Sequence, residues 1–240
     1  MNTTPHTDRV TWACPRAAGG TACARTLEGA HRVALRRPLH EDGGVFINIV
    51  DEAAATGPVA DYYEQQRKAW GFLPNYAPAF SPRPDVAQAW NLLNSTIRNG
   101  MERRRFELVT IAAARALHST YCTAAHAKFL RDICQDEESL HRIARSPDGA
   151  DLEPQDRAVY QFATKVATDA SSVEQTDVDQ LRAVGLTDAE IADVVYAAAA
   201  RAFFTRVLDG LGAQLDPSTA QTFDQQLLAS MIVGRPVAES

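Results

Sequence analysis

The sequence predicts an all-α protein, a helical bundle preceded by an irregular N-terminal extension. Few segments alternate polar and apolar residues with period two over the length of a strand. Apolar residues instead recur at helical spacing in segments that carry start and stop signals for helices. No run of about 18 apolar residues occurs, so a membrane-spanning helix is not expected.

Composition separates the chain into two parts. Residues 1–44 are rich in Pro, Gly, Thr and Arg, show no sustained period and include a basic run at 32–40. We expect this part to be a poorly ordered extension or an arm that binds a partner. Residues 45–240 form the predicted helical domain, which begins with a short apolar segment at 46–50.

Three helices are predicted in the first part of this domain. Residues 57–71 have Pro near the start and Gly at the end, as helices often do. A Pro-rich connection at 74–85 leads to an amphipathic helix at 85–100, which ends at Asn-Gly. Residues 104–118 then form a long helix with few polar positions, which predicts that most of it is buried.

Two further helices are expected in the middle of the chain. Ser119 and Thr120 are suitable cap residues for a helix that runs to about Cys134. Residues 153–170 follow, with Pro154 in a position that suits a first helical turn.

The last part of the domain contains three predicted helices. A short helix at 176–185 ends on Gly, and residues 187–212 begin with a capping box of Thr187 and Glu190. Alanines within the second of these helices allow neighbouring helices to approach closely. Residues 221–234 form the last predicted helix.

One stretch of the sequence combines a carboxylate, a lone cysteine and a histidine. Cys122 and His126 are four residues apart and therefore share one helix face. An antiparallel helix pair could bring Glu107 beside His126, where it would orient the ring. Cys122 would be the third residue of its helix, where the helix dipole favours a thiolate and a lowered pKa. Ser119, one turn earlier, could cap the helix or contact the sulfur, but it cannot form a disulfide.

The net charge and the cysteine pattern argue against nucleic-acid binding and a zinc site. The formal net charge of −6 argues against nucleic acid as the main partner. The four cysteines, at positions 14, 23, 122 and 134, form no Cys-x-x-Cys pair, which fits a reducing cytoplasm and gives no zinc motif. Cys134 lies roughly 18 Å along one helix from Cys122, too far to react with it. His118 could face the site or solvent.

The pattern Glu107–x14–Cys122–x3–His126 resembles the carboxymuconolactone decarboxylase and alkylhydroperoxidase D-like (AhpD-like) superfamily, and most of all its branch of peroxidase-related proteins. The usual motif there is Glu-x11-Cys-x2-Cys-x3-His, so Ser119 stands where the first cysteine is expected. Residues 71–86 and 185–212 are similar to two other segments of the family.

The resemblance implies an all-α fold, assembly as a homo-oligomer, and chemistry that needs no metal, haem or flavin. It assigns Cys122 as the reactive thiol, His126 as its acid–base partner and Glu107 as the relay carboxylate. Two positions depart from the family. Ser119 removes the dithiol cycle, and Thr205-Arg206 replaces a more usual Asn-Arg pair, although Arg206 could still form a salt bridge.

Three functions remain open on the sequence. The first is a peroxidase-like oxidoreductase in which Cys122 attacks a peroxide and an external thiol reduces the product. The second is decarboxylation or isomerisation of a small carboxylic acid or lactone by Glu107 and His126. The third is a non-enzymatic scaffold or redox sensor, suggested by the basic run. All three concern a protein expected in the cytoplasm, without nucleic-acid or membrane partners.

Overall fold

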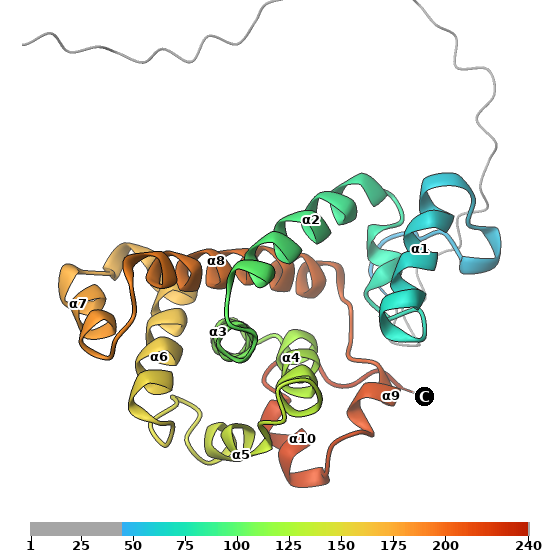
Figure 1. The fold of residues 1–240 in the computed structure, drawn as a ribbon. Helices are drawn as coiled ribbons and strands as arrows, with labels where there is room; N and C mark the ends of the chain where they lie inside the picture. Colours follow the sequence, from blue (N-terminus) through green and yellow to red (C-terminus); the bar gives the residue numbers. More distant parts are fainter. Residues whose placement is uncertain (1–44, 240) are drawn as a thin grey trace, which may run out of the picture. The chain divides into compact units, whose positions relative to one another are not determined.

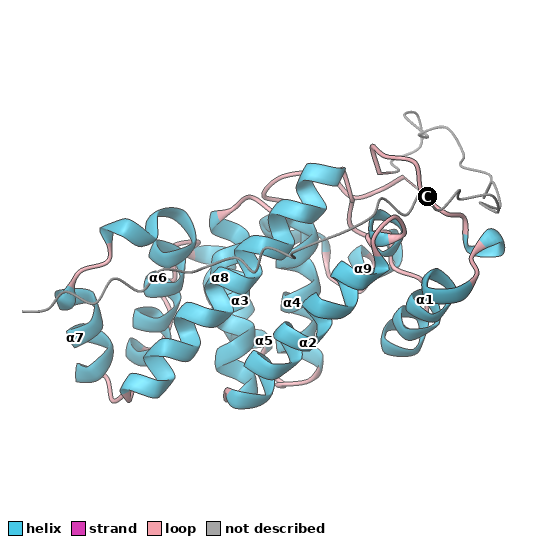
Figure 2. Ribbon diagram, turned by 90° about the horizontal axis from the view of Figure 1, so that it is seen from above, coloured by secondary structure: helices cyan, strands magenta, loops and turns pink. Residues whose placement is uncertain are grey.

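The structure, a computed structural model, describes residues 45–239. In this range the regular elements are helices, and the one β-type contact is an isolated bridge between Leu215 and Val237. Figure 2 shows helices and loops but no strand in the described part of the chain. The predicted all-α fold class is therefore confirmed. The predicted extension at 1–44, with Cys14, Cys23 and the basic run, lies outside the described residues.

The helices follow the order of the sequence signals. Their bounds are α1 Gly57–Trp70, α2 Pro84–Gly100, α3 Arg103–Ala116, α4 Thr120–Asp132, α5 Glu137–Arg145, α6 Pro154–Asp169, α7 Gln175–Ala183, α8 Asp188–Leu211, α9 Pro217–Ala220 and α10 Gln225–Met231. Short 3-10 helices occur at Glu52–Ala54, Ala77–Phe80 and Ala170–Ser172.

Helix α3 is the centre of the bundle. It packs against α4, α6 and α8, which surround it in Figure 1, where α3 is seen end-on. Its residues from Phe106 to Ala114 are all buried, and α8 contributes Ala197 and Ala198 to the same core. Small side chains on both helices let the backbones approach closely, which leaves little room for substitution. Helix α2 lies across this core and packs on α8 and α1.

Most predicted helix ends agree with the structure to within two residues. The capping box of Thr187 and Glu190 is present at the start of α8. Gly71 follows α1 in the left-handed conformation, with φ of 82°. Pro154 is the first residue of α6. These ends are set by local backbone chemistry, which is why the sequence predicts them.

Two expectations about the helices were wrong. Helix α5 was not predicted; it begins after Asp136, whose carboxylate accepts a hydrogen bond from Ser139 N. The helix expected at 221–234 is shorter: within that range only α10 forms, after Asp224, whose carboxylate accepts a hydrogen bond from Leu227 N, and the short α9 before it was not predicted. Helices α5 and α10 are both short, and in short helices tertiary contacts decide the structure.

The C-terminal segment packs over the turn between α3 and α4. Thr120 Oγ1 accepts hydrogen bonds from the backbone N–H groups of Val233 and Gly234, at 3.2 and 3.0 Å. A Cβ atom at Gly234 would lie 1.8 Å from the carbonyl oxygen of His118. Only glycine allows this approach, which fixes the turn that joins the two helices of the candidate site.

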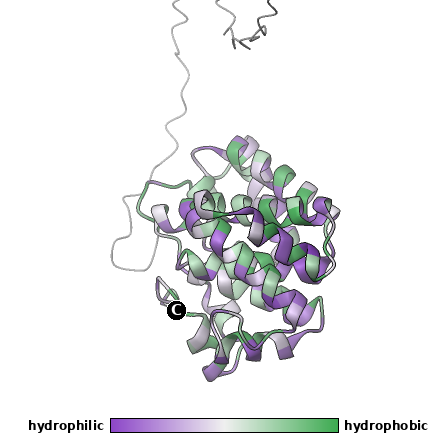
Figure 3. Cartoon of the chain, turned by 90° about the vertical axis from the view of Figure 1, so that its left-hand side faces the viewer, coloured by the Kyte–Doolittle hydropathy of each residue, from purple (hydrophilic) through white to green (hydrophobic). Residues whose placement is uncertain are grey.

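Polar and apolar positions alternate around the helices, as Figure 3 shows by the change from green to purple along each ribbon. This is the pattern of amphipathic helices around a shared core. Within residues 45–239, no helix is both long and apolar enough to span a bilayer.

Candidate active site

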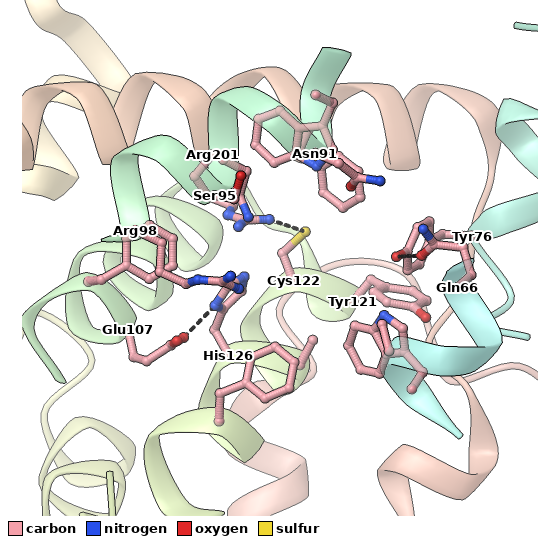
Figure 4. Close-up of a pocket in the computed structure, with 18 of the residues that line it drawn as sticks. Gln66, Tyr76, Asn91, Ser95, Arg98, Glu107, Tyr121, Cys122, His126 and Arg201 are labelled. Carbon is pink, nitrogen blue, oxygen red and sulfur yellow. Dashed lines mark hydrogen bonds and ion pairs between the residues drawn. The ribbon is translucent and has the colours of Figure 1, made fainter. Parts of the chain in front are cut away.

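The turn between α3 and α4 brings together residues that lie far apart in the sequence. Glu107 on α3 lies beside His126 on α4, with 2.5 Å between Glu107 Oε2 and His126 Nδ1 (Figure 4). The antiparallel helix pair expected from the spacing therefore gives the expected contact. The oxygen and nitrogen are close enough for a strong, charge-assisted hydrogen bond.

Glu107 is a buried carboxylate with two partners. Its side chain is fully buried, and its second oxygen accepts a hydrogen bond from Arg103 Nε at 2.5 Å. Burial opposes ionisation, but His126 and Arg103 outweigh it and hold the pKa of Glu107 below its ordinary value. The carboxylate is therefore ionised and fixed in position at neutral pH.

His126 is held as a neutral ring. Burial, and then the positive charge of Arg201, lower its pKa to about 4, although Glu107 acts in the opposite direction. A neutral imidazole carries one N–H, and the Glu107 carboxylate fixes that proton on Nδ1. Nε2 then keeps a free lone pair, so the ring can accept a proton during a reaction.

Cys122 lies in the first turn of α4, as predicted, and is buried. Its sulfur accepts a hydrogen bond from Arg201 Nη1 at 3.8 Å (Figure 4). We expected the helix N-terminus to lower the thiol pKa, and this was wrong. Burial raises the pKa of Cys122, and the opposing effects of Arg201 and Ser119 do not cancel it. The resting residue is a neutral thiol beside a cation.

Ser119 occupies the N-cap position of α4, but its side chain makes no capping hydrogen bond. Its hydroxyl is buried and has no hydrogen-bond partner of normal geometry among the described residues. It lies close enough to Cys122 and to Asp209 to oppose in part the rise in pKa that burial causes in each. The predicted contact with the sulfur is therefore supported, the predicted cap is not, and Ser119 does not line the cavity described below.

Arg201, on α8, was missed by the sequence analysis. It is 97% shielded from solvent, with 3% of its surface exposed, and no carboxylate of residues 45–239 forms an ion pair with it. Its Nε has no hydrogen-bond partner there. The guanidinium lies over the rings of Trp90 and Phe204, at 5.5 and 5.4 Å from their centroids. The sequence does contain a signal for Arg201: it is a charged residue within an apolar, Ala-rich helix. A buried charge in such a helix needs a compensating partner, which points to a functional role.

These groups line one cavity of about 600 Å³ between α1, α2, α3, α4 and α8. This is within the usual size range of small-molecule sites. Glu107, Cys122, His126 and Arg201 lie along its wall, and aromatic rings cover much of the rest. Among the aromatic residues of this lining are Trp70, Tyr76, Trp90 and Phe204.

The remaining candidates lie elsewhere. Cys134 follows the end of α4 as a free, partly buried thiol and does not line the cavity. His118 is in the turn before α4, with φ of 59°, and is not part of the lining either. Arg206 is exposed and forms no salt bridge within residues 45–239, so the salt bridge considered for it is not found. In the same range, no group of three or more His, Cys, Asp or Glu could hold a metal ion.

Comparison with known proteins agrees with this architecture. Residues 84–165, which include Glu107, Cys122 and His126, match the Carboxymuconolactone decarboxylase family. The fold is similar to the alkylhydroperoxidase AhpD core of a peroxidase-related protein from Ralstonia eutropha JMP134, with a TM-score of 0.64 and 22% identity over 80% of this chain and 98% of that one. The chain therefore has an AhpD-like helical fold. The resemblance seen in the sequence is confirmed for the fold, and the family model supports it over residues 84–165.

Two further structures have this AhpD-like fold. A peroxidase-related protein from Silicibacter sp. TM1040 is 18% identical, with a TM-score of 0.62, over 77% of this chain and 96% of that one. A variant of the debrominase Bmp8 in complex with 2,3,4-tribromopyrrole is 15% identical, with a TM-score of 0.64, over 78% of this chain and 100% of that one. No curated protein matches the chain.

Proposed function

We propose that this protein is a peroxidase-related oxidoreductase that uses Cys122 as its one reactive cysteine. Glu107 and His126 act as the proton relay, and an external thiol serves as the reductant. The proposal is supported most by one observation, the convergence of the thiol and the Glu107–His126 pair on the same cavity. The peroxidase-related proteins that share the fold point in the same direction.

The first half of the reaction consumes one peroxide. Cys122 Sγ attacks the terminal oxygen of ROOH, the O–O bond breaks, and the products are a sulfenic acid and ROH. His126 Nε2 accepts the thiol proton and returns it to the departing RO⁻. Arg201, in contact with the sulfur, stabilises the negative charge that develops there, and Glu107 stabilises the transient imidazolium.

The second half requires two equivalents of thiol. One thiol attacks the sulfenic sulfur and releases water, which leaves a mixed disulfide; the second thiol resolves it and regenerates Cys122. No thiol of the chain is placed to do this within residues 45–239, because the residue three before Cys122 is Ser119 and Cys134 lies outside the cavity. Since no thiol within residues 45–239 takes this part, we assign it to a reductant from solution.

Steady-state consumption of cumene hydroperoxide, with dithiothreitol as reductant, tests this proposal. Cys122→Ser should abolish turnover, and His126→Gln should slow it by about 10²-fold or more, since general acid–base catalysis contributes on that order. Cys134→Ser is the matched control and should keep the original rate. Turnover that survives Cys122→Ser would refute the redox function.

A second candidate is acid–base chemistry on a small carboxylic acid or lactone. One observation favours it: the neutral His126 ring and the ionised Glu107 form a complete proton shuttle without the sulfur, while burial keeps Cys122 protonated. The debrominase with this fold indicates that the scaffold also serves reactions other than peroxide reduction. Substrate turnover that persists in Cys122→Ser but is lost in His126→Gln would identify this chemistry.

A further inference from the structure

We propose that the cavity selects a flat, apolar molecule that carries one carboxylate, and that Arg201 and Arg98 bind this carboxylate. Within the proposed function, on which this identification of the substrate rests, the substrate is then a hydroperoxide of an apolar carboxylic acid. Hydrogen peroxide and uncharged alkyl hydroperoxides would be poorer substrates.

The first observation is the uncompensated charge of Arg201. A guanidinium has five N–H donors. Within the described part of the chain, Arg201 uses one of them, in the long contact to Cys122 Sγ, and its buried Nε has no partner. A buried cation is costly unless it is paired, and the sulfur beside it is protonated at rest. A ligand carboxylate would supply the missing negative charge through two parallel hydrogen bonds.

The second observation is the charge balance of the cavity wall. The charged residues that line it within residues 45–239 are three arginines and one glutamate. Glu107 is already paired with Arg103, so it does not neutralise the others. Arg98, at the α2 side of the cavity, forms no side-chain hydrogen bond or ion pair with residues 45–239, which leaves a second cation free for a ligand. The cavity is thus positive in a chain whose net charge is −6.

The third observation is the shape of the wall around Arg201. Trp90 and Phe204 are stacked, with ring centroids 4.8 Å apart and an angle of 12° between the rings. They fix the guanidinium before any ligand arrives, because the cation lies over their faces. Trp70 and Phe129 offer a further apolar surface in the same cavity. Flat apolar skeletons suit such walls, while the cation fixes one end of the molecule.

Figure 4 shows the side chains that would orient a substrate. Arg201 and Cys122 point toward each other from α8 and α4, and His126 lies one turn from the sulfur. A carboxylate on Arg201 holds the rest of the molecule against Cys122, where the peroxide oxygen has to be. Binding and chemistry would thus share the guanidinium, which makes Arg201 a determinant of specificity.

Calorimetric binding of 2-naphthoate and its uncharged amide, 2-naphthamide, tests this inference on the full chain. Naphthoate should bind at least about tenfold more tightly than naphthamide, which is about 1.4 kcal/mol. Arg201→Met should remove most of this difference. Arg206→Met is the matched control, because Arg206 is an exposed arginine on the same helix without an ion pair in the described range.

The two ligands can be compared on the unaltered protein, so the test does not depend on the folding of any variant. Equal binding of naphthoate and naphthamide, or no binding of either, would overturn the inference. Equal loss of naphthoate binding in Arg201→Met and Arg206→Met would do the same. Binding needs no reactive sulfur, so Cys122→Ser should retain it. A failed binding test with intact Cys122-dependent turnover would refute the carboxylate and leave the proposed function standing.

Discussion

Two buried charged side chains on the same cavity wall differ in how far the protein compensates their charge. Glu107 is held by Arg103 on one oxygen and by His126 on the other. Arg201 is equally buried, but it stacks on two aromatic rings and makes one long contact to a sulfur. Both oxygens of the Glu107 carboxylate have partners within the protein, whereas most N–H groups of the Arg201 guanidinium have none among residues 45–239.

The difference separates two kinds of functional residue. A charge whose partners belong to the fold has a fixed position and protonation state, as a proton relay requires. A charge without such partners is available to a ligand or to charge that develops in a reaction. We therefore assign the Glu107–His126 pair to proton transfer. Arg201 is assigned to substrate binding and to stabilising negative charge on the Cys122 sulfur.

The largest expected effect is on stability. Glu107→Ala should lower the free energy of unfolding by about 3 kcal/mol or more, because it leaves Arg103 without its counter-charge and the Nδ1–H of His126 without its acceptor. Arg201→Met should change it by less than about 1 kcal/mol, since it removes an uncompensated cation and keeps apolar contact with the rings. Urea denaturation of the two variants measures both values. A similar loss in both would show that the two charges are equally well compensated.

Acid should destabilise the protein through His126. Its pKa falls from 6.5 to about 4 on folding, so between these values the unfolded chain binds a proton that the folded chain does not. The free energy of unfolding should therefore decrease by about 3 kcal/mol as the pH falls from 6.5 to about 4. Below pH 4, protonation of His126 should cause no further decrease. Urea denaturation at a series of pH values measures this decrease, and His126→Asn should lack this part of it. An identical pH dependence in His126→Asn would show that other groups cause it.

The reactivity of Cys122 should depend on Arg201. This arginine lowers the thiol pKa against the effect of burial, so Arg201→Met should slow alkylation of Cys122 severalfold at a fixed, mildly alkaline pH. Mass spectrometry of iodoacetamide-treated protein can follow Cys122 and Cys134 together. Cys134 is the internal control, because it lies outside the cavity that Arg201 lines. Unchanged alkylation of Cys122 would mean that the contact has no electrostatic effect on the sulfur.

The smallest effect concerns Ser119. Its hydroxyl caps nothing and has no regular partner in residues 45–239, so Ser119→Ala should change the free energy of unfolding by less than about 0.5 kcal/mol. Thr187→Ala, at a working N-cap, should cost about 1 kcal/mol. Thermal or urea denaturation can compare the two. A loss at Ser119 as large as that at Thr187 would reveal a hydrogen bond to the sulfur or to Asp209.

The sequence predicts the parts of this site that depend on local geometry. The spacing of Cys122 and His126 on one helix, and the helix pair that brings Glu107 to His126, follow from helical periodicity and from the turn at Ser119. Arg201 was out of reach, because its position beside Cys122 arises from the packing of α8 on α4, 79 residues along the chain. The thiol pKa was predicted in the wrong direction, since the dipole of α4 is readable from sequence but complete burial is not.

Cys122 should react with peroxide in this cavity. Trapping with dimedone, followed by intact-protein and peptide mass spectrometry, tests it most directly. After addition of one equivalent of cumene hydroperoxide without reductant, the account predicts a dimedone adduct on Cys122, little or none on Cys134, and a much slower yield in His126→Gln. Absence of the adduct on Cys122, or equal labelling of both cysteines, would contradict it.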